Sequence, residues 1–235
     1  MTALEVAAAC RLVSEALSAV SDSEKASGMQ AYMRTDMPFY GVQKAGRTPI
    51  LRELVQRFQP KAAGEYRELV VGLWNLEHRE EKYIALGAAR HFKAFIRPEQ
   101  IDLYRALIVE GAWWDLVDEV ATHLIRALVV EFPQEAWKVV DTWADDPDMW
   151  LRRTALICQV GAKERTDSDR LFRFCAARAH EEEFFIRKAI GWALREYART
   201  NPHAVADFIN AHLNDLSGLS YREGSKHIGD LVESR

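Results

Sequence analysis

Four similar segments, each led by an aromatic residue, recur along the chain at nearly constant spacing. They are Tyr83-Ile-Ala-Leu-Gly-Ala, Trp114-Asp-Leu-Val-Asp-Glu, Trp150-Leu-Arg-Arg-Thr-Ala and Phe185-Ile-Arg-Lys-Ala-Ile. Their first residues lie 31, 36 and 35 positions apart, which fits one helix pair per repeat. We therefore predict an α-solenoid of about six HEAT-like helix pairs, whose second helices line one concave groove. The spacing alone leaves a closed helical bundle as the alternative.

The rest of the chain also has the period of an α-helix. Apolar residues recur three and four positions apart over 4–20, 51–58 and 103–109, and no segment alternates as a strand does. Proline marks expected helix starts because the first turn tolerates it. These prolines are Pro98, Pro133, Pro147 and Pro202. No Gly/Ser-rich linker interrupts the sequence, so we expect a single all-α domain over 1–235.

Several classes of protein are disfavoured by what the sequence lacks. No window approaches the ~18 apolar residues of a membrane span, and the N-terminus has no signal-peptide pattern, so we expect a cytoplasmic protein without membrane contact. The three cysteines, Cys10, Cys158 and Cys175, form no C-x-x-C pair and are expected to be reduced core thiols. The seven histidines show no ligand spacing. Neither a metal nor a cofactor is expected.

The net charge of -4 argues against nucleic-acid binding, but the charges are unevenly distributed. Residues 98–149 hold 3 basic and 12 acidic side chains, a net of -9, whereas 150–200 hold 11 basic and 7 acidic, a net of +4. This asymmetry suits a protein with one DNA-facing surface. A solvated acidic face beside a mixed face also occurs in many unrelated helical proteins, so the asymmetry alone is weak evidence for nucleic-acid binding.

The segment from Trp113 to Ile125 carries two stripes at helical spacing. The first is an ordinary core face: Trp113, Val117, Val120 and Leu124. The second comprises Trp114, Asp118, Ala121 and Ile125. In the second stripe an aromatic ring and a carboxylate lie side by side at i and i+4. Either Trp114 is a core residue and Asp118 pairs with a neighbouring helix, or the two form a functional pair at the edge of the groove.

Two further segments carry residues of interest. Arg153 occupies the repeat position that Val117 holds one repeat earlier, so it is either a buried partner for Asp118 or a clamp for a phosphate. The helix expected over 184–200 has Trp192 beside Gly191, and a mid-helix glycine costs about 1 kcal/mol relative to alanine. It indicates close packing or access by a ligand. The same helix carries basic residues: Arg187, Lys188, Arg195 and Arg199.

Five strings together resemble the AlkD-like DNA alkylation repair family of alkylpurine DNA glycosylases. They are YMRTDMPFYGVQ over 32–43, WWDLVD over 113–118, WLRRTA over 150–155, FFIRKAIGWALREYARTNP over 184–202 and LSGLSYREGSKH over 216–227. The resemblance implies catalytic roles for three residues: Asp118, Trp114 and Trp192. It implies DNA contacts for Arg153 and Tyr32, and the further basic residues Arg187, Lys188 and Arg195 are expected to follow the DNA backbone.

The implied reaction suits these residue types. A purine alkylated on a ring nitrogen is already cationic and leaves as a neutral base, so no general acid is required. The two indole faces attract a cation, and Asp118 stabilises the oxocarbenium-like sugar and orients water. We expect a monomeric, nucleoid-associated, monofunctional enzyme acting on duplex DNA without deep base flipping.

Two alternatives remain open from the sequence. The first is a non-catalytic HEAT-like scaffold that binds DNA or protein, since a fold alone implies no chemistry. The second keeps the chemistry but restricts it to self-resistance against a bulky alkylating natural product. The lesion preferred among 3-alkyladenine, 7-alkylguanine and bulky adducts stays open as well.

Overall fold

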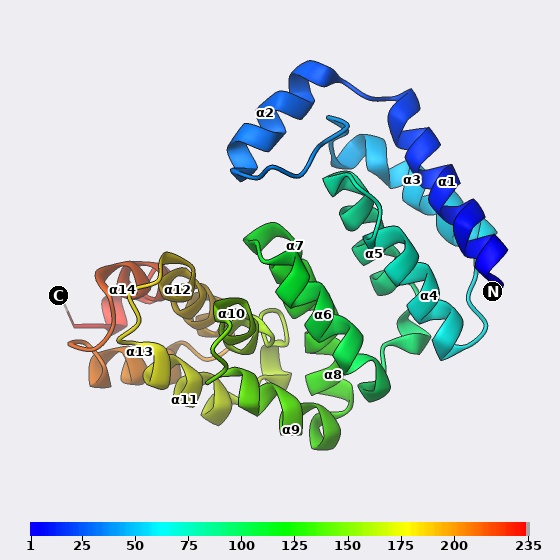
Figure 1. The fold of residues 1–235 in the computed structure, drawn as a ribbon. Helices are drawn as coiled ribbons and strands as arrows, with labels where there is room; N and C mark the ends of the chain where they lie inside the picture. The colour runs from blue at the N-terminus through cyan, green and yellow to red at the C-terminus, as the bar shows by residue number, and fades with distance from the viewer. Residues whose placement is uncertain (234–235) are drawn as a thin grey trace. The chain divides into compact units, whose positions relative to one another are not determined.

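The computed structural model describes residues 1–233, and every regular element in that range is a helix (Figure 1). The all-α architecture predicted from the apolar period is confirmed. Contacts between Cα atoms divide the chain into two compact units, one spanning Met1–Ile96 and the other beginning at Arg97. Each unit has its own buried core.

The first unit consists of five α-helices followed by a short 3₁₀ turn. The helices are α1 (Ala3–Ala19), α2 (Ser23–Met33), α3 (Lys44–Arg57), α4 (Ala63–Trp74) and α5 (Arg79–His91). Thr2 begins α1 with a capping box, in which its side chain and that of Glu5 each accept the other residue's backbone N–H. Leu17, Leu54 and Tyr66 are fully buried in this core. In contrast, α2 contributes no buried residue.

Four consecutive charged residues at the start of α5 are buried, which the sequence did not predict: Arg79, Glu80, Glu81 and Lys82. The Glu80 carboxylate accepts the backbone N–H groups of Tyr40, Gly41 and Val42 at 2.9 to 3.0 Å. These charge-assisted bonds offset the cost of burying Glu80. Gly41 has a φ of +83, and a Cβ there would lie 2.0 Å from the Asp22 carbonyl oxygen. Together these contacts fix the segment that follows α2.

The second unit consists of a series of helices joined by short turns. They are α6 (Ile101–Gly111), α7 (Trp114–Glu119), a π-helical segment (Val120–Ile125), α8 (Arg126–Glu131), α9 (Pro133–Trp143), α10 (Met149–Ile157), α11 (Ser168–Arg178), α12 (Phe184–Ala198), α13 (Pro202–Ala211) and α14 (Gly218–Gly224). Short 3₁₀ turns occupy Pro98–Gln100, Lys163–Arg165 and Gly229–Leu231.

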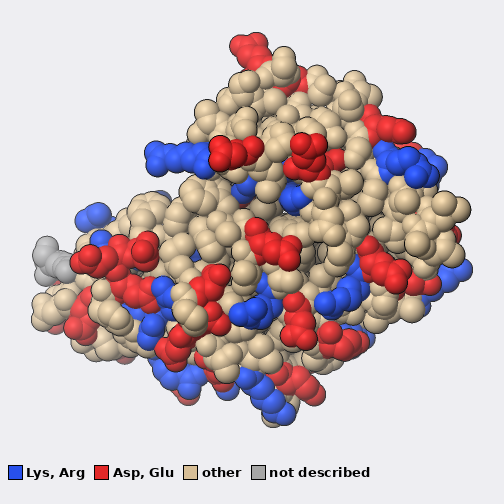
Figure 2. Space-filling model, viewed as in Figure 1, with Lys and Arg blue, Asp and Glu red and all other residues tan. Residues whose placement is uncertain are grey.

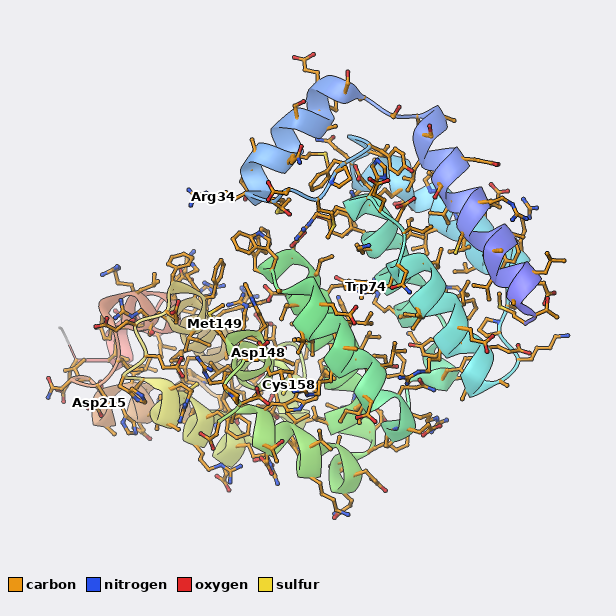
Figure 3. All side chains as sticks on the ribbon, viewed as in Figure 1. Arg34, Trp74, Asp148, Met149, Cys158 and Asp215 are labelled. Carbon is orange, nitrogen blue, oxygen red and sulfur yellow. The ribbon has the colours of Figure 1, made fainter. Side chains whose placement is uncertain are left out.

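The predicted repeat pairing is recovered in the order of these helices. The four aromatic-led segments lie on α5, α7, α10 and α12, each the second helix of a pair. Pro133 and Pro202 begin α9 and α13 as predicted. Pro98 and Pro147 lie three and two residues before α6 and α10 begin, near the first turn as expected. Asp148 is the N-cap of α10 and accepts the backbone N–H groups of Trp150 and Leu151 (Figure 3).

The uneven charge distribution is largely explained by ion pairs between successive repeats. On α9, Asp141 pairs with Arg170 and Arg173 of α11, at 3.1 and 2.7 Å. Asp145 pairs in the same way with Arg178 at 2.8 Å. Figure 2 shows acidic and basic side chains side by side over this part of the surface. The acidic segment therefore supplies partners for the basic one, and the asymmetry does not by itself indicate a DNA-facing surface.

The cysteines are unpaired thiols. Cys158 and Cys175 are fully buried, and burial raises the pKa of both thiols. Cys10 is only half-buried, and burial raises the pKa of its thiol as well. Within residues 1–233, no helix has both the length and the apolar character needed to cross a membrane.

Candidate active site

A cavity of about 270 Å³ opens in the second unit where α10 packs against α7 and α12. Its lining residues are Trp114, Asp118, Arg153, Phe184, Phe185, Lys188, Trp192 and Arg195. Six of the eight site residues predicted from the sequence therefore line one cavity. These six come from three helices that are consecutive second helices of the repeats.

The turn before α7 places Trp114 and Asp118 on the cavity wall. The chain leaves α6 through Ala112, whose φ of 35 is left-handed, and Trp113 is extended before α7 begins at Trp114. One helical turn separates Trp114 from Asp118, so both lie on the same face. Val117 on the other face is fully buried. The i and i+4 pair predicted from the sequence is thus oriented towards the cavity.

Directly after Asp118 the helix widens into the π-helical segment Val120–Ile125, where a regular α-helix was expected. The Thr122 hydroxyl donates to the Asp118 carbonyl oxygen at 2.7 Å. This bond satisfies a backbone acceptor next to the point where the register of helical hydrogen bonds changes. Such π-bulges are frequent at functional sites. No pattern in the sequence indicates this π-helical segment, because the apolar stripes continue through it.

Arg153 forms a two-pronged ion pair with Asp118. Its Nε and Nη2 atoms donate to the two carboxylate oxygens, each at 2.8 Å. Its Nη1 atom donates to the Phe185 carbonyl oxygen at 2.5 Å, in the first turn of α12. The exposed fractions of the two side chains are 6% for Arg153 and 17% for Asp118. Of the two roles considered for Arg153, the structure shows the buried partner of Asp118, and one guanidinium joins α7, α10 and α12.

The environment of Asp118 perturbs its ionisation. Burial raises the pKa of the Asp118 carboxyl, and the nearby negative charge of Asp115 acts in the same direction. The hydrogen bonds and the charge of Arg153 act against that increase and favour the ionised form. The charge on Asp118 therefore depends on Arg153.

On α12, Gly191 allows α14 to approach closely. A Cβ at Gly191 would lie 2.4 Å from the Glu223 Cβ and 3.1 Å from the Ser220 carbonyl oxygen. Of the two explanations considered for this glycine, close packing is confirmed. The close approach brings the Glu223 carboxylate between Lys188 and Arg195. Glu223 was not predicted as a site residue, because nothing in the sequence indicates that α14 packs here.

Two phenylalanines at the start of α12 were also missed. Phe185 packs against Trp113 and Trp150, with ring centroids 5.4 and 5.0 Å away, and supports the cavity floor. The Phe184 ring is 58% exposed at the rim. The Phe-Phe pair that begins this helix could have indicated them. Adjacent residues of a helix point in different directions, so only one of the two rings can face the core.

The two other predicted residues lie elsewhere. Arg187 is on α12, but its Nε atom donates to the Glu181 carbonyl oxygen at 3.0 Å, and it does not line the cavity. Tyr32 belongs to the first unit, in the last turn of α2, and its side chain is 74% exposed. It borders a separate apolar hollow with Met29, Met33 and Phe39. Among residues 1–233, no three His, Cys, Asp or Glu side chains converge as a metal site would require.

The packing at Gly191 gives a first testable expectation. Gly191→Ala is expected to lower the free energy of unfolding by about 1–3 kcal/mol, because the new methyl group must displace α14. Gly28→Ala is the control, since nothing lies within 4 Å of a Cβ at Gly28 in the middle of α2. Urea denaturation of both variants measures the difference. Equal stability of the two would contradict the packing described here.

The chain is similar to one protein family and to several solved structures. The family model described as DNA alkylation repair enzyme matches residues 13–228. A solved structure described as a predicted DNA alkylation repair enzyme from Enterococcus faecalis is 30% identical, with 88% of this chain and 96% of that one covered at a TM-score of 0.81. AlkD2 from Streptococcus mutans is 15% identical over 86% of this chain and 98% of its own, at a TM-score of 0.61. The protein smu.31 from Streptococcus mutans UA159 is 15% identical over 76% and 90%, at a TM-score of 0.58. These last two share the fold, and no curated protein matches the chain.

Proposed function

This chain belongs to the family of DNA alkylation repair enzymes, and we propose that it is a DNA glycosylase that releases positively charged alkylated purines from duplex DNA. The observation that carries the proposal is the convergence of two indole rings and one largely buried carboxylate on a single cavity. A cationic base and a developing sugar cation both find complementary groups there.

The two indoles suit a cationic base. Trp114 and Trp192 lie on different helices but line the same cavity. The face of an indole attracts a cation by about 0.5 to 2 kcal/mol, depending on how much water is excluded. A neutral purine lacks this attraction. The cavity therefore favours N3-alkyladenine and N7-alkylguanine over undamaged bases.

Asp118 is the group that faces the sugar. Cleavage of the N-glycosidic bond builds positive charge on the deoxyribose, and a preorganised carboxylate in a mostly dry site stabilises that charge. Each carboxylate oxygen has two lone pairs, of which Arg153 engages one. The second lone pair on each oxygen remains for the attacking water. A base that leaves neutral needs no proton, so no second carboxyl is required.

Arg153 acts through Asp118 in this proposal. All three of its guanidinium nitrogens donate to acceptors within the protein. It holds the carboxylate in one orientation and favours its ionised form. Arg153 is thus a positioning residue, and a direct contact between Arg153 and a phosphate stays a prediction from the sequence.

The backbone of the DNA is assigned to other cations. Lys188 and Arg195 line the cavity and remain 36% and 24% exposed. In this proposal they contact backbone phosphates near the lesion. The Lys188 Nζ atom is ion-paired with Glu223, whereas a Schiff-base nucleophile is a neutral amine. We therefore propose a monofunctional enzyme that leaves an abasic site without cutting the strand.

The direct test is a base-release assay on a duplex oligonucleotide with a single 7-methylguanine. The expected products are the free methylated base and a strand that breaks only after alkali treatment. The same assay on a second duplex with a bulky N7 adduct tests whether the open cavity accepts large groups. Tight binding without base release would leave a non-catalytic helical-repeat scaffold, and immediate strand cleavage would exclude the monofunctional mechanism.

Trp192→Leu tests the role of the indole face. The substitution keeps an apolar side chain but removes the ring, so kcat/KM for 7-methylguanine is expected to fall by about two- to thirtyfold. Trp192→Phe is the matched variant, and because it retains an aromatic face it should lose less activity. Equal activity of the leucine and phenylalanine variants would show that the ring contributes only its bulk.

A further inference from the structure

Glu223 of α14 bridges the two cations that line the cavity from α12. One carboxylate oxygen accepts from Lys188 Nζ at 2.8 Å. The other accepts from Arg195 Nη1. Lys188 and Arg195 are seven residues apart, two turns along the same helix face, and Trp192 lies between them in sequence. Glu223 therefore lies beside the head groups that flank one of the two indoles.

This bridge is a fixed part of the fold. The Glu223 Cβ lies over Gly191, where no larger residue leaves room for it. The Glu223 side chain is 24% exposed. The hydrogen bond from Lys188, with the charges of Lys188 and Arg195, lowers the pKa of the Glu223 carboxyl, so it is ionised at neutral pH.

The charges around the cavity pose a problem that Glu223 addresses. The charged residues lining it are one carboxylate, Asp118, and three cations, Arg153, Lys188 and Arg195. Such a lining attracts phosphates but repels a positively charged base. Glu223 is not in the lining, yet it touches two of the three cations and removes one of the two excess positive charges. At short range one unit of charge changes an interaction energy by about 1 kcal/mol even in water, or about fivefold in binding.

We propose that Glu223 sets the charge selectivity of the cavity, by offsetting Lys188 and Arg195 so that a cationic base is accepted next to the cations that hold the phosphates. The proposal rests on the proposed function, because it takes an alkylated purine as the ligand. It predicts that Glu223 weakens binding to undamaged DNA and strengthens the preference for a cationic lesion. Loss of Glu223 should therefore raise the affinity for undamaged DNA and lower the preference for the lesion. A residue with a merely structural role would not change these two quantities in opposite directions.

The test compares wild type with Glu223→Gln by equilibrium binding to two duplexes of the same sequence. One duplex is unmodified, and the other has a 7-methylguanine whose 2′-fluoro sugar resists base loss. Glu223→Gln is expected to bind the unmodified duplex about fivefold more tightly and to lose about fivefold of the preference for the methylated duplex. Binding is measured without turnover, so a failure of base release by the wild type leaves this result separately readable.

Two further variants make the comparison decisive. Glu196→Gln makes the same charge change on α12, where Glu196 pairs with Arg199 at 3.8 Å and does not line the cavity, so the lesion preference should stay within about twofold of wild type. Glu223→Asp keeps the charge and should keep both quantities nearer to wild type than Glu223→Gln does. If Glu223→Gln does not fold, the test rests on Glu223→Asp. The affinity of this variant for the unmodified duplex and its preference for the methylated duplex are each expected within about threefold of wild type. A larger shift in either value counts against the proposal.

The proposal is overturned if Glu223→Gln weakens binding to both duplexes, leaves both unchanged, or strengthens both equally. It is also overturned if Glu196→Gln reduces the lesion preference as much as Glu223→Gln. If the wild type itself shows no preference for the methylated duplex, the proposal on Glu223 fails as well.

Discussion

Asp118→Asn is expected to slow release of 7-methylguanine from duplex DNA by tenfold or more, with little change in affinity for DNA. The substitution removes the negative charge and almost no volume. The amide oxygen can accept only one of the two hydrogen bonds that Arg153 donates to the carboxylate, so a loss of stability is expected beside the loss of charge and is measured by urea denaturation. Removing one preorganised group that stabilises developing charge costs roughly 2.7–4 kcal/mol in other enzymes, or about 10²–10³-fold in rate, so tenfold is the smallest effect expected here. Single-turnover base release and equilibrium binding measure the two effects separately.

Glu119→Gln is the matched control for this variant. It neutralises the next carboxylate on α7, which pairs with His123 at 3.4 Å and does not line the cavity. Base release should remain within about twofold of wild type, as expected for a partly exposed pair. Unchanged base release by Asp118→Asn would show that Asp118 has no part in the mechanism. A similar loss of base release in Glu119→Gln would show that the loss follows from the change in overall charge and not from the position of Asp118.

Arg153→Met is expected to lower both stability and activity. Removing one partner of a largely buried ion pair costs about 3–5 kcal/mol, because Asp118 is left without compensation. Burial already raises the pKa of Asp118, and loss of Arg153 raises it further. A carboxylate is inactive when protonated, so the acid limb of the pH profile for base release should move to higher pH than in the wild type.

The same shift in pKa affects folding with a defined sign. In Arg153→Met, protonation of Asp118 relieves the uncompensated charge, so the loss of stability should be largest above the raised pKa and should shrink as the pH falls. The double variant Asp118→Asn/Arg153→Met removes both charges and should recover part of the stability but none of the activity. Urea denaturation across pH measures this. An unchanged acid limb in Arg153→Met would show that Arg153 does not control the charge on Asp118.

Much of the fold could be predicted because it depends on local pattern. The helical period and the aromatic-led repeats identified α7, α10 and α12 as second helices of successive pairs. The i and i+4 spacing of Trp114 and Asp118 was sufficient to put both on one face. Arg153 stood out because it replaced an apolar residue at a repeat position. These signals all lie within one segment or recur at a fixed distance.

What could not be predicted depends on how distant segments pack. Glu223 reaches Lys188 and Arg195, which line the cavity, only because α14 lies against Gly191, some thirty residues earlier in the chain. The buried charge of Glu80 follows from three backbone N–H groups that a distant loop presents to it. Charged residues are expected at the surface unless such partners exist, and the sequence does not reveal the partners. The charge blocks were weak evidence for the same reason, since many of those charges pair with one another.

The pairing of acidic α9 with basic α11 has a consequence for how a protein of negative net charge approaches a polyanion. Charges that alternate within a few ångströms cancel beyond the screening length of about 8 Å in physiological salt. The electrostatic potential of this face is therefore small at a distance, so the face neither attracts nor repels the double helix. Long-range attraction must come from cations on other parts of the surface, and a formal charge of -4 says little about which side of the molecule meets the nucleic acid.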